Sequence, residues 1–121
     1  MIILYVSDQE QSKTFYQLVL GTEPLLHVPG MTEFILSSDF KLGLMPEKGI
    51  AKIICPHTPD PASGNGIPRC ELYLKVSDPS ESLHRAMKAG AKAISQSELR
   101  NWGDTVSYCA DPDGHVIAFF N

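Results

Sequence analysis

The segment Leu4-Tyr5-Val6-Ser7-Asp8 returns at positions 74–78 as Leu74-Lys75-Val76-Ser77-Asp78, with four of its five residues unchanged. Each copy closes an apolar run and is followed by a helical pattern that stops at a glycine, Gly21 or Gly90. A duplication over more than half of the 121-residue chain constrains the fold more than any single residue could. We therefore expect two copies of one module, with a ligand on the sheet faces that their helices leave open.

The first copy is predicted to be a strand, a helix and three further strands. Residues 1–7 are apolar and rich in β-branched or aromatic side chains, as a buried strand requires. Asp8 is the expected helix N-cap, with Gln11 placed for a capping box, and Gly21 suits the left-handed position after the helix. The turn pairs Pro29-Gly30 and Ser38-Asp39 then separate three short strands, expected near residues 25–28, 33–37 and 41–46.

The second copy carries stronger signals. Residues 70–76 predict a strand, and Asp78 is the expected N-cap, with Pro79 at the first helical position and Glu81 two residues later. Strands are expected near residues 92–95, 105–109 and 116–120. The last two are joined by an Asp-Pro-Asp-Gly turn at 111–114, which has proline and glycine where a bulged hairpin needs them.

The connection between the copies, residues 47–69, contains four prolines and the Gly64-Asn65-Gly66 stretch, so a helix is not expected there. Ile50, Ile53 and Ile54 predict one short strand at its start. The chain is thus expected to form one domain over residues 1–121, with module one at 1–46, the linker at 47–69 and module two at 70–121. The predicted class is α+β, with two strand–helix–three-strand modules forming curled mixed sheets.

Composition narrows the range of partners. The net charge of −4 and the absence of Lys or Arg clusters argue against a nucleic acid or an anionic membrane surface. No apolar run is long enough to span a membrane. Cys55, Cys70 and Cys109 are odd in number and widely spaced, and no CxxC pair is present. We therefore expect reduced thiols in a cytoplasmic protein and no structural zinc site.

The Val-Ser-Asp strand ends, together with the stretch from Trp102-Gly103-Asp104 to the Asp-Pro-Asp-Gly-His of residues 111–115, resemble the vicinal oxygen chelate superfamily. That superfamily contains glyoxalase I, the bleomycin-resistance proteins and the extradiol dioxygenases, and this chain looks most like the small bleomycin-resistance-like members. The resemblance implies a homodimer in which paired modules curl into incomplete barrels. It also implies that the concave faces of these barrels hold a small-molecule ligand.

Metal-binding members of that superfamily place one ligand on the first strand and one on the last strand of each module. Carried over residue by residue, these positions fall on Met1, Glu71 and Ala118, and on Leu44 or, with a slip of one residue, Gly43. Of these only Glu71 offers a donor suited to a hard divalent cation. We therefore expect no metal, no cofactor and no catalytic residue.

Strand alternation predicts which side chains face away from the helices. The resulting surface is apolar and aromatic with a small polar group, which is typical of a small-molecule site. The predicted ligand-binding residues are Ile3, Tyr5, Leu44, Glu71, Tyr73, Lys75, Trp102, Ala118 and Phe120. The alternative is that these residues form a dimer core in which Glu71 and Lys75 make an ordinary ion pair.

The function expected from the sequence is metal-independent binding or sequestration of a small, partly apolar organic molecule. A second hypothesis is a metal-dependent lyase, isomerase or dioxygenase of the glyoxalase kind, with Glu71 joined by His27 or His57. A third is a structural dimer with an occluded groove. His84 and His115 are expected on a solvated helix face and at a strand edge, and Cys70 and Cys109 have no histidine at motif spacing.

Overall fold

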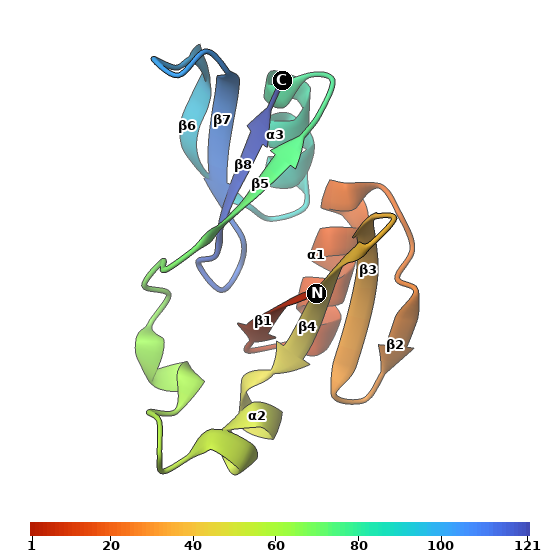
Figure 1. Cartoon of the computed structure of the whole chain (residues 1–121), viewed down its shortest axis with the longest axis vertical. Coiled ribbons are helices and arrows are strands. Elements are labelled where there is room, and N and C mark those ends of the chain that lie inside the picture. The colour runs from red at the N-terminus through yellow and green to blue at the C-terminus, as the bar shows by residue number, and fades with distance from the viewer. The chain divides into compact units, whose positions relative to one another are not determined.

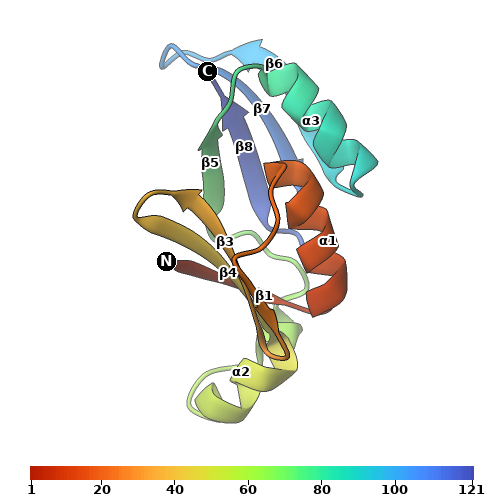
Figure 2. The ribbon, with the colours of Figure 1, turned by 90° about the vertical axis from the view of Figure 1, so that its right-hand side faces the viewer.

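The computed structural model describes all 121 residues and divides into two compact units, Met1–Asn65 and Gly66–Asn121. Each unit contains a four-stranded mixed sheet with a helix packed against one face (Figures 1 and 2). The order of elements within each begins strand, helix, three strands, so the predicted α+β class with two βαβββ modules is confirmed. None of the helices is both long and apolar enough to cross a membrane.

The first unit builds its sheet in the order β1-β4-β3-β2, with β1 parallel to β4 and the other neighbours antiparallel. Helix α1 packs on β3 and β4 and buries Phe15, Tyr16 and Val19 against the sheet. The elements are β1 (Ile2–Val6), α1 (Gln9–Leu20), β2 (Leu26–Val28), β3 (Met31–Ser37), β4 (Phe40–Pro46), α2 (Glu47–Ile54) and the 3-10 helix η1 (Pro61–Gly64).

The predicted ends of α1 are both confirmed. The Asp8 carboxylate accepts a hydrogen bond from the Gln11 backbone N–H at 2.9 Å, which satisfies one of the free amides of the first turn. Gly21 ends the helix with φ +66°, a left-handed conformation that costs glycine little, and its N–H donates to the Gln17 carbonyl.

The second unit repeats this arrangement with the sheet order β5-β8-β7-β6, again with the first strand parallel to the last. Asp78 caps α3 more fully than Asp8 caps α1, because its carboxylate accepts from the N–H groups of both Ser80 and Glu81. The elements are β5 (Glu71–Lys75), α3 (Pro79–Lys88), β6 (Lys92–Leu99), β7 (Thr105–Ala110) and β8 (Val116–Phe120).

One buried polar contact joins the start of α3 to its sheet. Ser107 on β7 is fully buried, and its hydroxyl donates to the Pro79 carbonyl at 2.7 Å. The carbonyl lies in the first turn of α3, so this bond sets where the helix begins to cross the strands. It also satisfies a hydroxyl that would otherwise be buried without a partner.

The strand predicted from Ile50, Ile53 and Ile54 is wrong, because these residues lie in helix α2. Their spacing of three and then one residue matches a helix period, and the prolines of the connection all follow α2, so none interrupts it. Helix α2 contacts β1 and β4 of its own unit, and Ile53 on its outer side is 76% exposed.

The second unit begins with a close backbone contact. A Cβ placed on Gly114 would lie 2.8 Å from the Gly66 carbonyl oxygen and 2.9 Å from its Cα. Gly114 also has φ +92°, so both its backbone conformation and its surroundings require glycine. The turn between β7 and β8 is therefore packed directly on the segment that leads into β5.

Candidate binding site on the open sheet faces

The open face of the second sheet is the one opposite α3. Leu72, Ile117 and Phe119 are buried on the α3 side, whereas the residues that alternate with them point the other way. Residues paired across neighbouring strands share a face, and Glu71, Tyr73 and Lys75 pair with Val116, Ala118 and Phe120. The structure thus places the predicted residues Glu71, Tyr73, Lys75, Ala118 and Phe120 on one face.

Tyr73 is the centre of this face. Its hydroxyl donates to the Asp104 carboxylate at 2.8 Å and accepts from the Trp102 indole N–H at 3.1 Å. Its ring stacks on Phe120 with centroids 4.4 Å apart and an interplanar angle of 24°. Four side chains from β5, β8 and the β6–β7 loop are therefore linked into one arrangement, called the Tyr73 cluster below: Tyr73, Trp102, Asp104 and Phe120.

The loop that carries Trp102 is closed by its own backbone. The Arg100 N–H donates to the Asp104 carbonyl at 2.8 Å, and the Gly103 N–H donates to the Arg100 carbonyl at 3.0 Å. Gly103 has φ +105°, which suits a glycine between Trp102 and Asp104. Trp102 nevertheless remains 57% exposed, so a large flat ring is held in place with much of its surface in solvent.

The phenol of Tyr73 is a hydrogen-bond donor rather than a base. Burial raises its pKa above the ordinary 10.0, the Trp102 hydrogen bond lowers it in part, and the hydrogen bond and charge of Asp104 raise it again. The proton therefore stays on Tyr73 at neutral pH. Within the cluster, Tyr73 therefore acts as a hydrogen-bond donor that orients the Asp104 carboxylate.

A second polar group on this face surrounds Arg100. Its guanidinium lies 5.4 Å from the centroid of the Tyr108 ring and donates to the hydroxyl of Ser95 at 2.6 Å and to Glu98 at 3.1 Å. Tyr108 pairs with Ala118, which puts it on the open face. The Nε of Arg100 is buried without a hydrogen-bond partner.

The open face of the first sheet is apolar, and one predicted residue is not on it. Ile3 and Tyr5 point away from α1 as expected, paired with Gly43 and Met45. Leu44 was assigned to this face wrongly. It pairs with Leu4 and Thr32 on the α1 side and is 0% exposed. Because side chains alternate, an error of one residue along β4 moves Leu44 from the open face to the core.

The superfamily's metal position on the last strand of the first module, which the sequence left between Leu44 and Gly43, therefore falls on Gly43. A Cβ there would lie 3.0 Å from Cγ1 of Ile3 and 3.2 Å from the Met1 sulfur, so apolar side chains cover it. On the adjacent strand, Glu33 of β3 forms an ion pair at 2.9 Å with Lys41 of β4, and the Glu33 side chain is mostly buried. Glu33 pairs with Gly43 and so faces the same way, which the sequence alone did not reveal.

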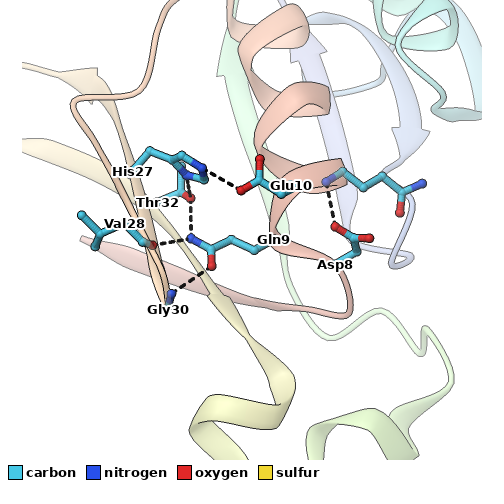
Figure 3. Close-up of polar contacts among 8 residues, drawn as sticks. Asp8, Gln9, Glu10, His27, Val28, Gly30 and Thr32 are labelled. Atoms are coloured by element: carbon cyan, nitrogen blue, oxygen red, sulfur yellow. Dashed lines mark hydrogen bonds and ion pairs between the residues drawn. The ribbon is translucent and has the colours of Figure 1, made fainter.

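His27 lies on the α1 side of the sheet and not on the open face. Its Nδ1 lies 2.8 Å from the Thr32 hydroxyl and its Nε2 lies 2.8 Å from the Glu10 carboxylate (Figure 3). Gln9 completes the network, donating to Thr32 and to the Val28 carbonyl. These bonds join the start of α1 to the β2–β3 hairpin, and they leave His27 directed away from any ligand on the open face.

The residues at the superfamily's metal positions do not fit a metal. With Gly43 in place of Leu44, the set is Met1, Gly43, Glu71 and Ala118. Gly43 and Ala118 have no side-chain donor, the Met1 thioether is soft, and Ala118 is completely buried. One exposed carboxylate, Glu71, is not a divalent-cation centre, and His27 is held elsewhere.

A different group, Asp111, Asp113 and His115, brings its ligand atoms within 4.8 Å of one another. Asp111 is already committed there: one carboxylate oxygen accepts from the N–H groups of Asp113 and His115, and the other lies 2.8 Å from His115 Nδ1. These contacts close the hairpin between β7 and β8. His57 and His84 are exposed and belong to neither group.

Cys109 is not a nucleophile. It is fully buried on the α3 side, and burial together with the charge of Asp111 raises its pKa from 9.0 to about 12. The thiol therefore remains protonated across the physiological range.

Two βαβββ modules, each with an open sheet face, define a class of fold and not a particular reaction. The glyoxalase-like domain family matches residues 1–120. The chain therefore belongs to this family and, through it, to the vicinal oxygen chelate superfamily.

Related proteins share the fold over nearly the whole chain. A glyoxalase-related enzyme from Fulvimarina pelagi superposes with a TM-score of 0.83 at 21% identity, covering 98% of this chain and 84% of that one. A glyoxalase/bleomycin resistance protein/dioxygenase family enzyme from Burkholderia phytofirmans gives 0.84 at 16% identity, with 99% and 94% covered. An uncharacterized protein from Mycobacterium bovis is 27% identical over 115 residues, which are 93% of this chain and 75% of that protein.

Proposed function

We propose that this protein binds a small, partly apolar organic molecule on its open sheet faces without a metal ion, as the bleomycin-resistance-like members of its superfamily do. The observation that carries the proposal is the Tyr73 cluster. A tyrosine, a tryptophan and a phenylalanine are held by directed contacts on a face that no helix of the unit covers. Fixed aromatic surface with a few polar atoms is the usual composition of a ligand site.

The first unit supports the same proposal through its apolar open face. Met1, Ile3 and Tyr5 are large hydrophobic residues that remain exposed, whereas Leu4 and Val6, which alternate with them, are buried. Contiguous exposed apolar surface of this kind marks a place where a ligand or another protein surface binds. We propose that a second copy of the chain covers part of it in a homodimer.

Metal-dependent chemistry of the glyoxalase kind is disfavoured by the side chains themselves. Three of the four superfamily metal positions carry Met1, Gly43 and Ala118. His27, which the second hypothesis needs as an additional metal ligand, is held by its contacts with Thr32 and Glu10. Elemental analysis of protein purified without chelator tests this, and we expect far less than one transition ion per chain. A stoichiometric ion would favour the enzymatic alternative.

Ligand binding is tested by a thermal-shift screen of small aromatic and amphipathic compounds. A compound at 100 times its Kd should stabilise the fold by about 2.7 kcal/mol. For each hit, Tyr73→Ala should weaken binding, whereas Glu81→Gln on α3, away from the open face, should not. The proposal fails if no compound stabilises the protein, or if every hit binds Tyr73→Ala as tightly as the wild type.

The screen also addresses the third hypothesis, an occluded structural dimer. In that case light scattering would give a dimer, but Tyr73→Ala would lower the dimer's stability and no compound would bind. A ligand-binding dimer predicts instead that the dimer persists in Tyr73→Ala while the affinity for the ligand falls.

A further inference from the structure

We propose that the Tyr73 cluster selects an organic cation, a protonated or quaternary amine attached to a flat apolar group. This inference rests on the proposed function, because it names the class of molecule that the same open face would bind. It comes from the directions of the hydrogen bonds within the cluster and from the charges that surround it.

The directions of these hydrogen bonds follow from the groups involved. An indole N–H can only donate, so the Tyr73 oxygen must be the acceptor for Trp102. The hydroxyl proton of Tyr73 is then directed to the Asp104 carboxylate, which can only accept when it is ionised. Both polar edges of the two rings are used within the protein. What the cluster offers a ligand is the ring faces and the remaining lone pairs of Asp104.

These groups favour positive charge. The face of an aromatic ring carries the negative part of its quadrupole, and tryptophan and tyrosine are the rings that attract cations most strongly. Asp104 adds a full negative charge beside them, with one side-chain hydrogen bond, to Tyr73, and further acceptor capacity. An anionic ligand in the same place would lie against this carboxylate without a donor from the cluster to bind it.

The other charged groups of this face do not reverse the balance. The Arg100 guanidinium is paired with Glu98 and lies on Tyr108, so its charge is largely compensated. Glu71 and Lys75 flank Tyr73 along β5, one on each side, and both are exposed. Lys75 is a long side chain that can extend into solvent when a cation binds, whereas the loop fixes Asp104.

The apolar part of the ligand is set by the exposed ring. Trp102 shows more than half of its surface to solvent while its N–H is fixed to Tyr73, so it provides a preformed platform. A flat group stacked there would lose little of the protein's conformational freedom. An ammonium carried by that group could then reach the Asp104 carboxylate and the face of Tyr73.

The experiment compares three probes of similar shape: phenethylammonium, phenethyl alcohol and 3-phenylpropionate. Trp102 is the single tryptophan of the chain, so its fluorescence reports on the site directly. At pH 7 we expect the ammonium to bind most tightly and the carboxylate most weakly. Asp104→Asn should weaken ammonium binding about fivefold or more and leave the alcohol nearly unchanged. Glu81→Gln removes the same charge from α3 and should change neither.

Equal affinity for all three probes, tighter binding of the carboxylate, or no binding of the ammonium at millimolar concentration would overturn the cation assignment. The proposed function would survive these results if other compounds in the screen bind and depend on Tyr73. If Asp104→Asn does not fold, the wild type still decides. Its affinity for the ammonium should fall between low and high salt while its affinity for the alcohol stays constant, and a salt-independent affinity would refute the proposal.

Discussion

The substitution Leu44→Ala tests whether Leu44 belongs to the core or to the open face of the first unit. Leu44 is 0% exposed and packs on the α1 side between Leu4 and Thr32. Truncating such a leucine removes its transfer free energy and leaves a cavity, which together cost about 2–5 kcal/mol. For a chain of this size, a loss of about 3 kcal/mol corresponds to a decrease in Tm of roughly 10 °C. Urea unfolding followed by far-UV circular dichroism measures the change.

The matched control is Ile3→Ala on the neighbouring strand, where the side chain points to the open face and is 39% exposed. We expect it to cost about 1 kcal/mol or less, because less apolar surface leaves water there on folding. The assignment of Leu44 to the core would be refuted if Leu44→Ala cost no more than Ile3→Ala. A loss of ligand affinity at unchanged stability would restore Leu44 to the binding face.

Three further outcomes follow from the structure. Cys70 is exposed and Cys109 is buried, so a thiol reagent should modify Cys70 in the native protein and reach Cys109 only on unfolding. The pKa of Cys109 is higher in the folded state than in the unfolded state, so its protonated thiol contributes to the free energy of unfolding, and this contribution is complete below about pH 9. It should decline as the pH rises towards about 12, with a slope approaching about 1.4 kcal/mol per pH unit that Cys109→Ala abolishes in alkaline urea titrations. Asp78→Ala should destabilise by about 1 kcal/mol and by more than Asp8→Ala, because Asp78 caps two amides and Asp8 one, and thermal unfolding would contradict this if the order were reversed.

The repeated module was predictable because its signals are local. Asp8, Asp78, Gly21 and the Pro-Asp-Gly turn act within a few residues of themselves, so their roles do not depend on distant partners. Helix α2 was missed for the opposite reason. The prolines after residue 55 argued against a helix anywhere in residues 47–69, although the isoleucines at the start of this connection already had a helical spacing.

The site was predictable only in part. Alternation counted back from Asp78 placed Glu71, Tyr73 and Lys75 on the open face, where the structure has them, since β5 is short and ends three residues before Asp78. On β4 the same argument failed at Leu44. A register irregularity between Ile35 and Ser37 in the preceding hairpin means that counting from the turn does not fix which residues face the core.

The bonds of the Tyr73 cluster lie beyond what sequence patterns contain. Tyr73 is separated from Trp102 by 29 residues and from Asp104 by 31, and both contacts are between side chains. The proximity of Trp102 and Asp104 around Gly103 was the available signal, and it identified the loop but not its partner. Arg100 gave no signal at all, because its contacts depend on how the β6–β7 hairpin folds.

The contact of Gly66 with Gly114 has a practical consequence for engineering this chain. Backbone contacts backbone there, so the β7–β8 hairpin fixes the position of Gly66, at the start of the segment that leads into β5. Extra residues inserted between positions 65 and 66 would lengthen only the connection between the two units and leave the Gly66–Gly114 contact intact. The same insertion after Gly66 would lengthen the segment between the Gly66–Gly114 contact and β5, and so would disturb the pairing of β5 with β8.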